Sequence, residues 1–171
     1  ARANEELGGV DASKANAILK ACDEILEGKL LDQFVLDAIN SGAGTAFNMN
    51  SNEVIANRAL EILGRRKGEY TVISPNDHVN MSQSSNDTFP TAMHVAILIN
   101  MQPLLSSVDT LIESLDKKSS HFESYIKIGR THLMDAIPVT VGAEFKAFSY
   151  SLKKARQKIA MSIENLEYVA L

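Results

Sequence analysis

The sequence predicts an all-α fold in which a bundle of long helices follows a small helical region. Apolar residues recur at spacings of three and four over most of the chain, whereas alternating, strand-like stretches are scarce. The chain also has no low-complexity tract and no linker rich in proline or glycine. With 171 residues, of which 45% are apolar and 22% charged, it can bury a core of ordinary size.

The first two predicted helices each end at a glycine. The first has Ser13 as its expected N-cap and ends before Gly28. The second covers roughly residues 48–63 and closes at Gly64, which three basic residues follow. Residues 69–73 are strand-like but short, so we expect a hairpin arm or an extended connection there.

Two longer helices follow. The first starts near Asn86, and its apolar seam is typical of a bundle helix. Pro103 lies inside the pattern without an amide donor, which predicts a kink or a local break. The seam consists of His94, Leu98, Met101, Leu105, Val108, Ile112, Leu115, Ser119 and Phe122. After a connection over residues 124–141, the last helix carries the stripe Phe145, Phe148, Leu152, Ala155, Ile159, Ile163, Leu166 and Ala170.

This order of elements predicts two domains. We assign residues 1–84 to part of an N-terminal domain and residues 85–171 to the first part of a helical bundle. The chain begins without an initiator methionine or the blocks of a signal peptide, and its last stripe runs to the terminus without a glycine cap. We therefore expect a fragment of a longer protein.

Composition argues against several partners. Seventeen basic and 21 acidic residues give a net charge of −4, so a broad basic surface for nucleic acid or anionic lipid is not expected. The single cysteine, Cys22, cannot form an internal disulfide, and no run approaches the roughly 18 apolar residues that span a bilayer. We expect a cytosolic protein that contacts neither nucleic acid nor membrane.

Three segments concentrate short polar side chains where turns meet helices: residues 41–45, 82–87 and 129–132. The first amides of a helix are unpaired and carry partial positive charge, so neutral donors beside them suit a small carboxylate or phosphate dianion. The simpler interpretation is that Ser85 or Asp87 is only an N-cap, and that Gly42 and Gly44 only permit a tight turn.

Histidines offer one candidate for proton chemistry. His132, with Arg130 and Asp135 nearby in the sequence, can donate to a carboxylate or hold a proton near neutral pH. His94 and His121 are expected to be packing or surface residues, and the spacing leaves His78 undecided. Spacings typical of metal sites, dinucleotide folds and phosphate loops do not occur, so no metal and no cofactor are expected.

Three longer blocks of sequence carry a resemblance to a known family. They are residues 42–58 (Gly-Ala-Gly-Thr-Ala-Phe-Asn-Met-Asn through Arg58), residues 75–92 (Pro-Asn-Asp-His-Val-Asn through Ala92) and residues 129–138 (Gly-Arg-Thr-His through Pro138). In this order they resemble the fumarase/aspartase superfamily over essentially the whole chain. The resemblance implies a homotetramer on a shared helical bundle, with each active site assembled from three segments of three subunits.

The resemblance also implies roles for individual residues. Thr45, Ser84, Ser85, Asn86, Thr131 and His132 match positions that surround a four-carbon dicarboxylate in the family, and Thr131 and His132 match catalytic positions. The family's base is a serine on a glycine-rich loop that also brings a lysine and an asparagine. Its Gly-Ser-Ser-x-Met-Pro segment does not occur among these 171 residues, so we expect them to be inactive alone.

Small differences bear on which reaction the resemblance implies. The first block begins Gly-Ala-Gly-Thr, the lead-in is Asp32-Gln-Phe-Val-Leu-Asp-Ala-Ile39, and Ser74 precedes the second block; all three resemble aspartases. Ser84-Ser85-Asn86 instead has the form usual in class II fumarases. Aspartase is therefore favoured and fumarase is the alternative, since a single pocket group discriminates weakly. A non-catalytic scaffold on the same fold, as in lens proteins, is the alternative of another class.

Overall fold

A computed structural model of the protein describes residues 1–39 and 42–169. The chain contains two compact units, one made chiefly of Ala1–Met93 and the other of His94–Tyr168. The division falls within a long helix that begins at Ser85. The domain boundary expected between residues 84 and 85 coincides with the start of that helix and stays a prediction.

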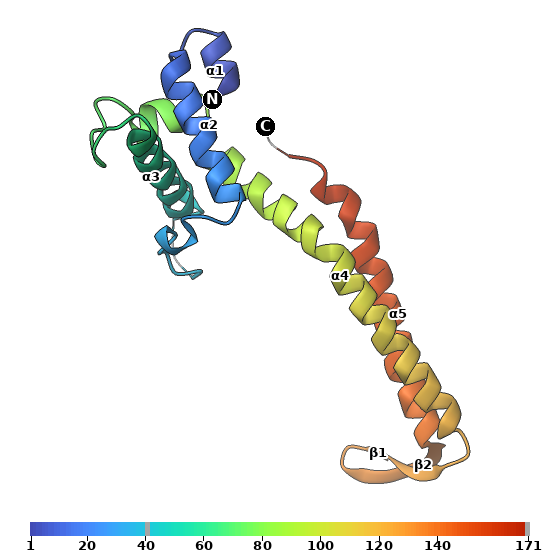
Figure 1. The fold of residues 1–171 in the computed structure, drawn as a ribbon. Helices are drawn as coiled ribbons and strands as arrows, with labels where there is room; N and C mark the ends of the chain where they lie inside the picture. Colours follow the sequence, from blue (N-terminus) through green and yellow to red (C-terminus); the bar gives the residue numbers. More distant parts are fainter. Residues whose placement is uncertain (40–41, 170–171) are drawn as a thin grey trace. The chain divides into compact units, whose positions relative to one another are not determined.

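The first unit is helical (Figure 1). Its elements are α1 (Arg2–Glu6), α2 (Ala12–Leu26), a 3-10 turn η1 (Leu31–Gln33), α3 (Thr45–Ile62), a π-helical turn η2 (Pro75–Val79) and the start of α4 (Ser85–His121). Its core is formed where α2 and α3 pack together, and small alanines let the two helices approach. The buried cluster consists of Ala17, Ile18, Ala21, Ala56, Ala59, Leu60 and Ile73.

Three local predictions for this unit need correction. The N-cap of α2 is Asp11, whose carboxylate accepts from the amide of Lys14 at 3.0 Å, and not Ser13. Helix α3 begins at Thr45, three residues earlier than predicted, because Gly44 adopts a positive φ of 85° as its N-cap residue. Residues 70–72 form turns and not the hairpin arm considered for 69–73.

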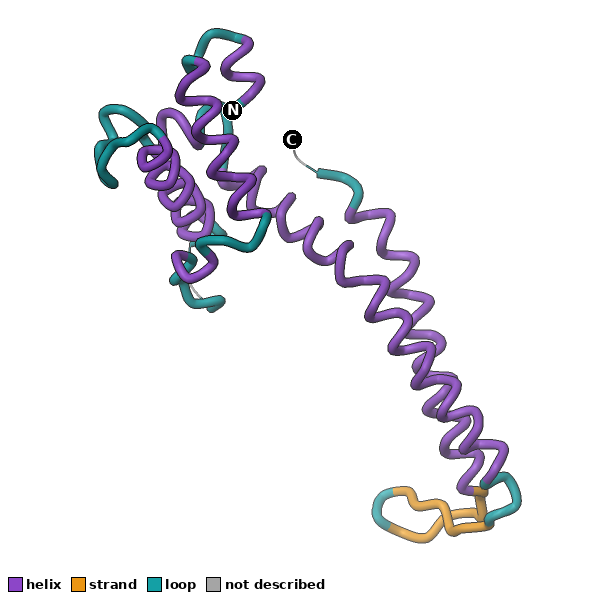
Figure 2. The backbone as a smooth tube through the Cα atoms, in the orientation of Figure 1, coloured by secondary structure: helices purple, strands orange, loops and turns teal. Residues whose placement is uncertain are grey.

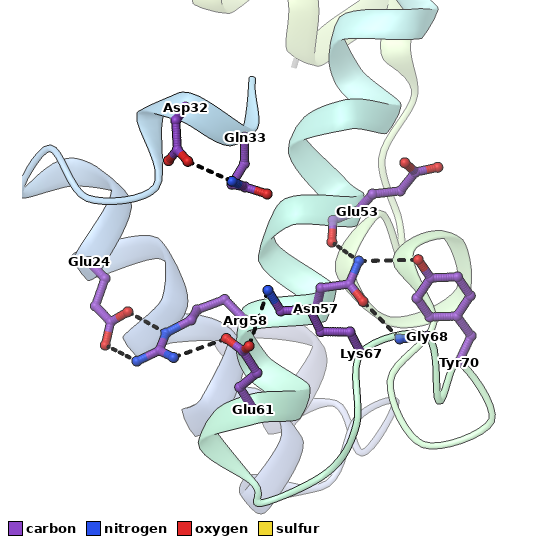
Figure 3. Close-up of polar contacts among 10 residues, drawn as sticks. All are labelled: Glu24, Asp32, Gln33, Glu53, Asn57, Arg58, Glu61, Lys67, Gly68 and Tyr70. Atoms are coloured by element: carbon purple, nitrogen blue, oxygen red, sulfur yellow. Dashed lines mark hydrogen bonds and ion pairs between the residues drawn. The ribbon is translucent and has the colours of Figure 1, made fainter. Parts of the chain in front are cut away.

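An ion-pair network joins α2 to α3 (Figure 3). The Arg58 guanidinium donates to both carboxylate oxygens of Glu24, at 2.5 and 2.9 Å, and to Glu61 at 3.1 Å. Lys67 lies 3.2 Å from the other oxygen of Glu61. The hydrogen bonds from Arg58 lower the pKa of the Glu24 and Glu61 carboxyls. The paired geometry therefore holds these helices together in the ionised state.

The second unit is a pair of long helices with a hairpin at one end. It contains most of α4, then β1 (Ile126–Thr131), β2 (Met134–Thr140) and α5 (Val141–Leu166). Figure 2 shows the two antiparallel strands between the end of α4 and the start of α5. Residues 124–141 were predicted to be a plain connection, and the hairpin corrects that prediction.

Side chains of α4 pack on α5 along the predicted seam. All nine seam positions from His94 to Phe122 are buried or half-buried, with Leu105 and Ile112 the most buried. Arg156 of α5 donates to both oxygens of Asp109, at 2.7 and 2.9 Å. At Gly142, an added Cβ would overlap the carbonyl oxygen of Ser119, so this glycine permits the close approach of α5 to the end of α4.

Two predictions concern helix continuity. At Pro103 the sequence predicted a kink or a local break, and the structure excludes only the break. Helix α4 continues without interruption through Pro103, so the local break considered there is absent from this described helix. Helix α5 ends at Leu166, and Ala170, the last member of its predicted stripe, lies outside the described residues. Phe148 of that stripe is 59% exposed, so α5 packs on α4 with only part of the stripe.

Helix α4 is also long and apolar enough to cross a membrane, judged by length and composition alone. An 18-residue window in it has a mean hydropathy of 1.5, and only 11% of that window is buried. The expectation that no segment approaches this composition was therefore wrong. A single such helix is weak evidence for a membrane, because core helices of soluble proteins have the same character.

The Glu24–Arg58 pair makes stability depend on pH in a defined direction. Because the folded-state pKa of Glu24 is lowered, the pair stabilises the protein above about pH 4.5 and loses this effect as the pH falls through the lowered pKa. Glu24→Gln should therefore reduce the urea midpoint at pH 7, with the gap to wild type closing in acid.

The matched control is Glu27→Gln, since Glu27 pairs with Lys29 in a contact that is about 60% exposed on both sides. This substitution should change the midpoint little at any pH. An equal effect of the two substitutions would contradict the assignment of the α2–α3 link to Glu24.

Candidate functional site

The Ser-Ser-Asn segment forms the start of α4, and Ser84 caps it. The carbonyl of Ser84 accepts from the amides of Asp87 and Thr88 at 3.1 and 3.0 Å, and its hydroxyl oxygen accepts from the amide of Asn86 at 3.2 Å. The cap is thus Ser84 and not Ser85 or Asp87. The side chains of Ser85 and Asn86 are not used for capping, and that of Asn86 is exposed.

A network of amide side chains links the start of α4 to α3. The side-chain amide of Asn48 donates to the Ser85 hydroxyl oxygen at 2.8 Å and to Asn80 Oδ1 at 3.1 Å. Asn52, which is only 4% exposed, donates to the same Asn80 oxygen at 3.1 Å. Thr88 Oγ1 lies 3.2 Å from Asn48 Oδ1 and 3.0 Å from the Ser84 carbonyl oxygen, and it can donate its one hydrogen to either. These contacts bring two of the three predicted segments, those of Thr45 and Ser85, to one end of the first unit.

Thr45 is the first residue of α3 and lies one turn before Asn48, with its side chain exposed. The preceding residues Gly42, Ala43 and Gly44 all have positive φ, which accounts for the glycines on backbone grounds. Glycine is required at position 44 for a second reason, because a Cβ there would overlap the ring of Phe89 on α4. Ser41, the first residue of the predicted cluster, lies outside the described residues.

The close approach at Gly44 allows two aromatic rings to stack. Phe47 and Phe89 have ring centroids 5.4 Å apart at an interplanar angle of 12°. With Asn48 and Thr88 they line a hollow of about 290 Å³ between α3 and α4. The polar N-terminal ends of α3 and α4 therefore lie next to an apolar contact, the stacked rings of Phe47 and Phe89.

Thr131 and His132 belong to the second unit and lie at the tip of its hairpin. Thr131 pairs with Met134, so His132 and Leu133 form a two-residue turn, with φ of 49° and 61°. Both side chains of the Thr131-His132 pair are exposed. Arg130 and Asp135, noted as neighbours of His132 in sequence, face each other across the strands at 3.7 Å.

His78, left undecided by the sequence, is engaged within the π-helical turn. Its Nδ1 accepts from the amide of Ser74 at 2.9 Å, and the Ser74 hydroxyl oxygen accepts from the amide of Asp77 at 3.1 Å. An imidazole nitrogen that accepts a hydrogen bond is unprotonated, so the proton of neutral His78 is on Nε2. His78 thus shapes the turn that places Asn80.

A separate polar cavity of about 190 Å³ lies beside α3 and η1, lined in part by Gln33, Glu53 and Arg58. Figure 3 shows that several of its lining residues bond one another or residues close by. Asn57, for example, accepts from the amide of Gly68 at 2.9 Å and donates to the Tyr70 hydroxyl at 3.2 Å. The cations that line this cavity, Arg58 and Lys67, are already paired with Glu24 and Glu61.

Four residues of this network were not predicted from the sequence to belong to the site: Asn48, Asn52, Asn80 and Thr88. All four lie inside the quoted blocks, and the spacing of four between Asn48 and Asn52 places both on one face of a helix. That spacing indicates that the two side chains could bond the same residue. Which residue they bond, Asn80, is determined by the tertiary structure.

The described residues thus form a helical fold in which neutral hydroxyl and amide groups gather at the N-terminal ends of α3 and α4. Comparison with known families identifies the class of protein. The family model described as "Lyase" matches residues 1–171, and the chain therefore belongs to this lyase family. The resemblance to the fumarase/aspartase superfamily is confirmed, and so is the predicted helical-bundle fold.

Individual relatives are enzymes of two kinds. The chain is 49% identical to an aspartate ammonia-lyase of Bacillus sp over 166 residues, which cover 97% of the chain and 36% of that protein. It is 49% identical to a class II fumarate hydratase of Helicobacter pylori over 169 residues, 98% of the chain and 36% of that protein. The chain thus spans about 36% of the length of these relatives.

A solved structure agrees with the fold. The chain superimposes with a TM-score of 0.82 on a protein described as fumarate lyase:delta crystallin from Brucella melitensis. The two sequences are 46% identical, and the match covers 99% of this chain and 40% of the other.

The contact at Gly44 yields a stability prediction. Gly44→Ala should lower the free energy of unfolding by about 1–3 kcal/mol, because the added methyl overlaps Phe89 at a positive φ. Gly42→Ala is the matched control, since its φ of 105° is also positive but its Cβ would meet open space. Urea unfolding followed by circular dichroism should show the smaller loss for Gly42→Ala. Equal losses would mean that backbone strain, and not Phe89, sets the requirement at position 44.

Proposed function

We propose that the protein containing this chain is an aspartate ammonia-lyase, which converts L-aspartate into fumarate and ammonia. The observation that supports this most directly is the set of neutral donors at the start of α4, in a chain whose relatives include aspartate ammonia-lyases. The Gly-Ala-Gly-Thr turn, the lead-in at residues 32–39 and Ser74 favour aspartate over malate.

The chemistry explains why neutral donors suit this site. The proton removed is on the carbon beside the side-chain carboxylate of aspartate and is very weakly acidic. The base, which in this family is the serine of a loop not among these 171 residues, takes the proton. The electron pair of the broken C–H bond moves into that carboxylate as an enediolate, which preorganised donors stabilise. The electrons then return to form the carbon–carbon double bond as the carbon–nitrogen bond breaks, releasing ammonia. Hydroxyl and amide groups can donate hydrogen bonds both to the carboxylate of the substrate and to the more highly charged enediolate, without forming a fixed ion pair with either.

Each predicted residue has a proposed part in this scheme. Thr45, Ser84, Ser85 and Asn86 bind the dicarboxylate through hydroxyl and amide hydrogens. Ser84 can still donate its hydroxyl hydrogen although its oxygen caps α4. At the hairpin tip, Thr131 and His132 complete the donor set, with His132 orienting charge on the substrate.

We further propose that three subunits contribute to each site of a homotetramer. Residues 88–108 of α4 contain no Asp, Glu, Lys or Arg, and several of their apolar side chains are exposed, including Ile99 at 70% and Leu104 at 48%. Exposed apolar surface of this extent on a helix favours coverage by further helices. Bundle partners, and not lipid, are the proposed cover, in keeping with the lyase family.

The remaining expectations follow the same proposal. No redox cofactor is required, because the elimination moves an electron pair within the substrate. We propose a cytosolic location, since a sequence with one cysteine makes no internal disulfide. The 171 residues alone are expected to be inactive, because the serine loop typical of the family is not among them.

Class II fumarase is the second candidate function. Ser84-Ser85-Asn86 has the form usual in fumarases, and the Helicobacter pylori fumarate hydratase is also 49% identical. A catalytically inert scaffold is the third, but it would not require the complete donor set of Thr45, Ser85, Asn86 and His132.

The substrate proposal is tested by offering L-aspartate and L-malate separately to the full-length protein, without added cofactor. Absorbance of fumarate should rise with aspartate and remain near baseline with malate. Turnover of malate alone would replace the proposal with fumarase. No turnover of either would support the scaffold.

The site proposal is tested with Asn86→Ala and His132→Ala. Each should lower kcat/KM by at least tens of fold, as loss of one preorganised donor commonly costs about a hundredfold. Lys117→Ala is the control on α4, because Lys117 is exposed and lies outside residues 88–108, the part of the helix proposed to contact other subunits. Circular dichroism should remain unchanged in all three. Near-normal kcat/KM in Asn86→Ala or His132→Ala would remove that residue from the site.

A further inference from the structure

We propose that Asn48 is a positioning residue that holds the Ser85 hydroxyl as a hydrogen-bond donor toward the substrate. This inference rests on the proposed function, since it concerns the same dicarboxylate site. It adds a residue from α3 that does not itself touch substrate and acts through Ser85. The geometry of the amide network supports this inference. In that network, each side chain determines whether the next one donates or accepts a hydrogen bond.

The directions of the hydrogen bonds are fixed at one end of the network by a backbone carbonyl. The carbonyl of Gln83 can only accept, so the side-chain nitrogen of Asn80, 3.3 Å away, faces it. The oxygen of Asn80 therefore faces Asn48 and must receive a hydrogen from it, at 3.1 Å. This orients the Asn48 nitrogen toward Ser85 as well, at 2.8 Å, while its oxygen lies 3.2 Å from the Thr88 hydroxyl, which is also 3.0 Å from the Ser84 carbonyl. A reversed Asn48 amide would set its oxygen against that of Asn80.

The consequence for Ser85 is specific. A hydroxyl has one hydrogen to donate and lone pairs that accept. Because the Asn48 amide donates to Ser85 Oγ, this contact uses a lone pair and leaves the hydroxyl hydrogen for another acceptor. A substrate carboxylate is such an acceptor. The network thus biases Ser85 toward donation before substrate arrives.

Burial makes the bias strong. Asn52 is only 4% exposed and donates to the same oxygen of Asn80, so two amides hold that oxygen as an acceptor. Asn48 and Ser85 are half-buried. Water competes weakly for hydrogen bonds in such surroundings, so the polarity of one amide is transmitted to the next.

Two substitutions at Asn48 test this inference, because the one that better preserves the shape of the side chain should lower activity more. Asn48→Asp preserves shape but replaces the donor with a carboxylate that captures the Ser85 hydrogen, whereas Asn48→Ala leaves the hydroxyl free to rotate. In the full-length protein, Asn48→Asp should lower kcat/KM by about ten- to a hundredfold, and more than Asn48→Ala does. Asn50→Asp is the matched control on α3 and should stay within about twofold, since Asn50 bonds the Gln33 carbonyl away from this network.

A double-substitution cycle with Ser85→Ala separates positioning from other effects. If Asn48 acts through Ser85, then Asn48→Asp should cost less than about threefold in the Ser85→Ala background. Simple repulsion of the substrate by the new carboxylate, or general loss of structure, would give the same loss in both backgrounds and would overturn the inference. A larger loss from Asn48→Ala than from Asn48→Asp would also overturn it.

The outcomes distinguish this inference from the function on which it rests. Absence of turnover of aspartate and malate by the wild type would overturn both. An active wild type with additive losses at Asn48 and Ser85 would overturn this inference alone. Thermal unfolding of each variant, followed by circular dichroism, ensures that folded proteins are compared.

Discussion

The missing side chain at Gly44 determines how closely α3 and α4 can approach at their N-terminal ends. Phe89 occupies the space that a Cβ would fill, and this lets its ring stack on Phe47. Asn48 is then within hydrogen-bonding distance of Ser85 and Thr88. The absence of a side chain at one turn residue thus sets the distance between α3 and α4. The hydrogen bonds between the two helices, with their fixed donors and acceptors, depend on that distance.

Charged and neutral polar groups have separate places where the helices of this molecule meet. Ion pairs join helix flanks at Arg58 with Glu24 and Glu61 in the first unit and at Arg156 with Asp109 in the second, while Arg130 and Asp135 pair within the hairpin. The ends of α3 and α4 instead present hydroxyls and amides, with Asp87 as the acidic residue of the first turn of α4. This separation has a physical benefit. A dianion arriving at neutral donors does not have to break an existing salt bridge, so its charge is not competing with a carboxylate of the protein.

Periodicity predicted the long helices well, because the seam from His94 to Phe122 reflects packing that a single repeating pattern encodes. It failed where local chemistry competes: Asp11 precedes Ser13 and is the better placed cap, and the hairpin was missed because its turn is His132-Leu133 and not a typical turn pair such as Asn-Gly. The residue types of the site could be predicted from the blocks that carry the family resemblance. Their pairing could not, since the bond from Asn48 to Ser85 joins residues 37 apart in sequence.

The tip of the hairpin has a bearing on how this chain balances stability against activity. His132 and Leu133 both adopt left-handed backbone conformations, which cost side-chain-bearing residues about 1 kcal/mol or more each, and Leu133 is 92% exposed. Selection for folding alone would favour asparagine and glycine at these two positions. The role proposed for His132 would account for an imidazole in such a place, because natural proteins accept a loss of stability where a side chain is needed for chemistry. The hairpin is therefore a segment in which consensus-based stabilisation would conflict with the proposed activity.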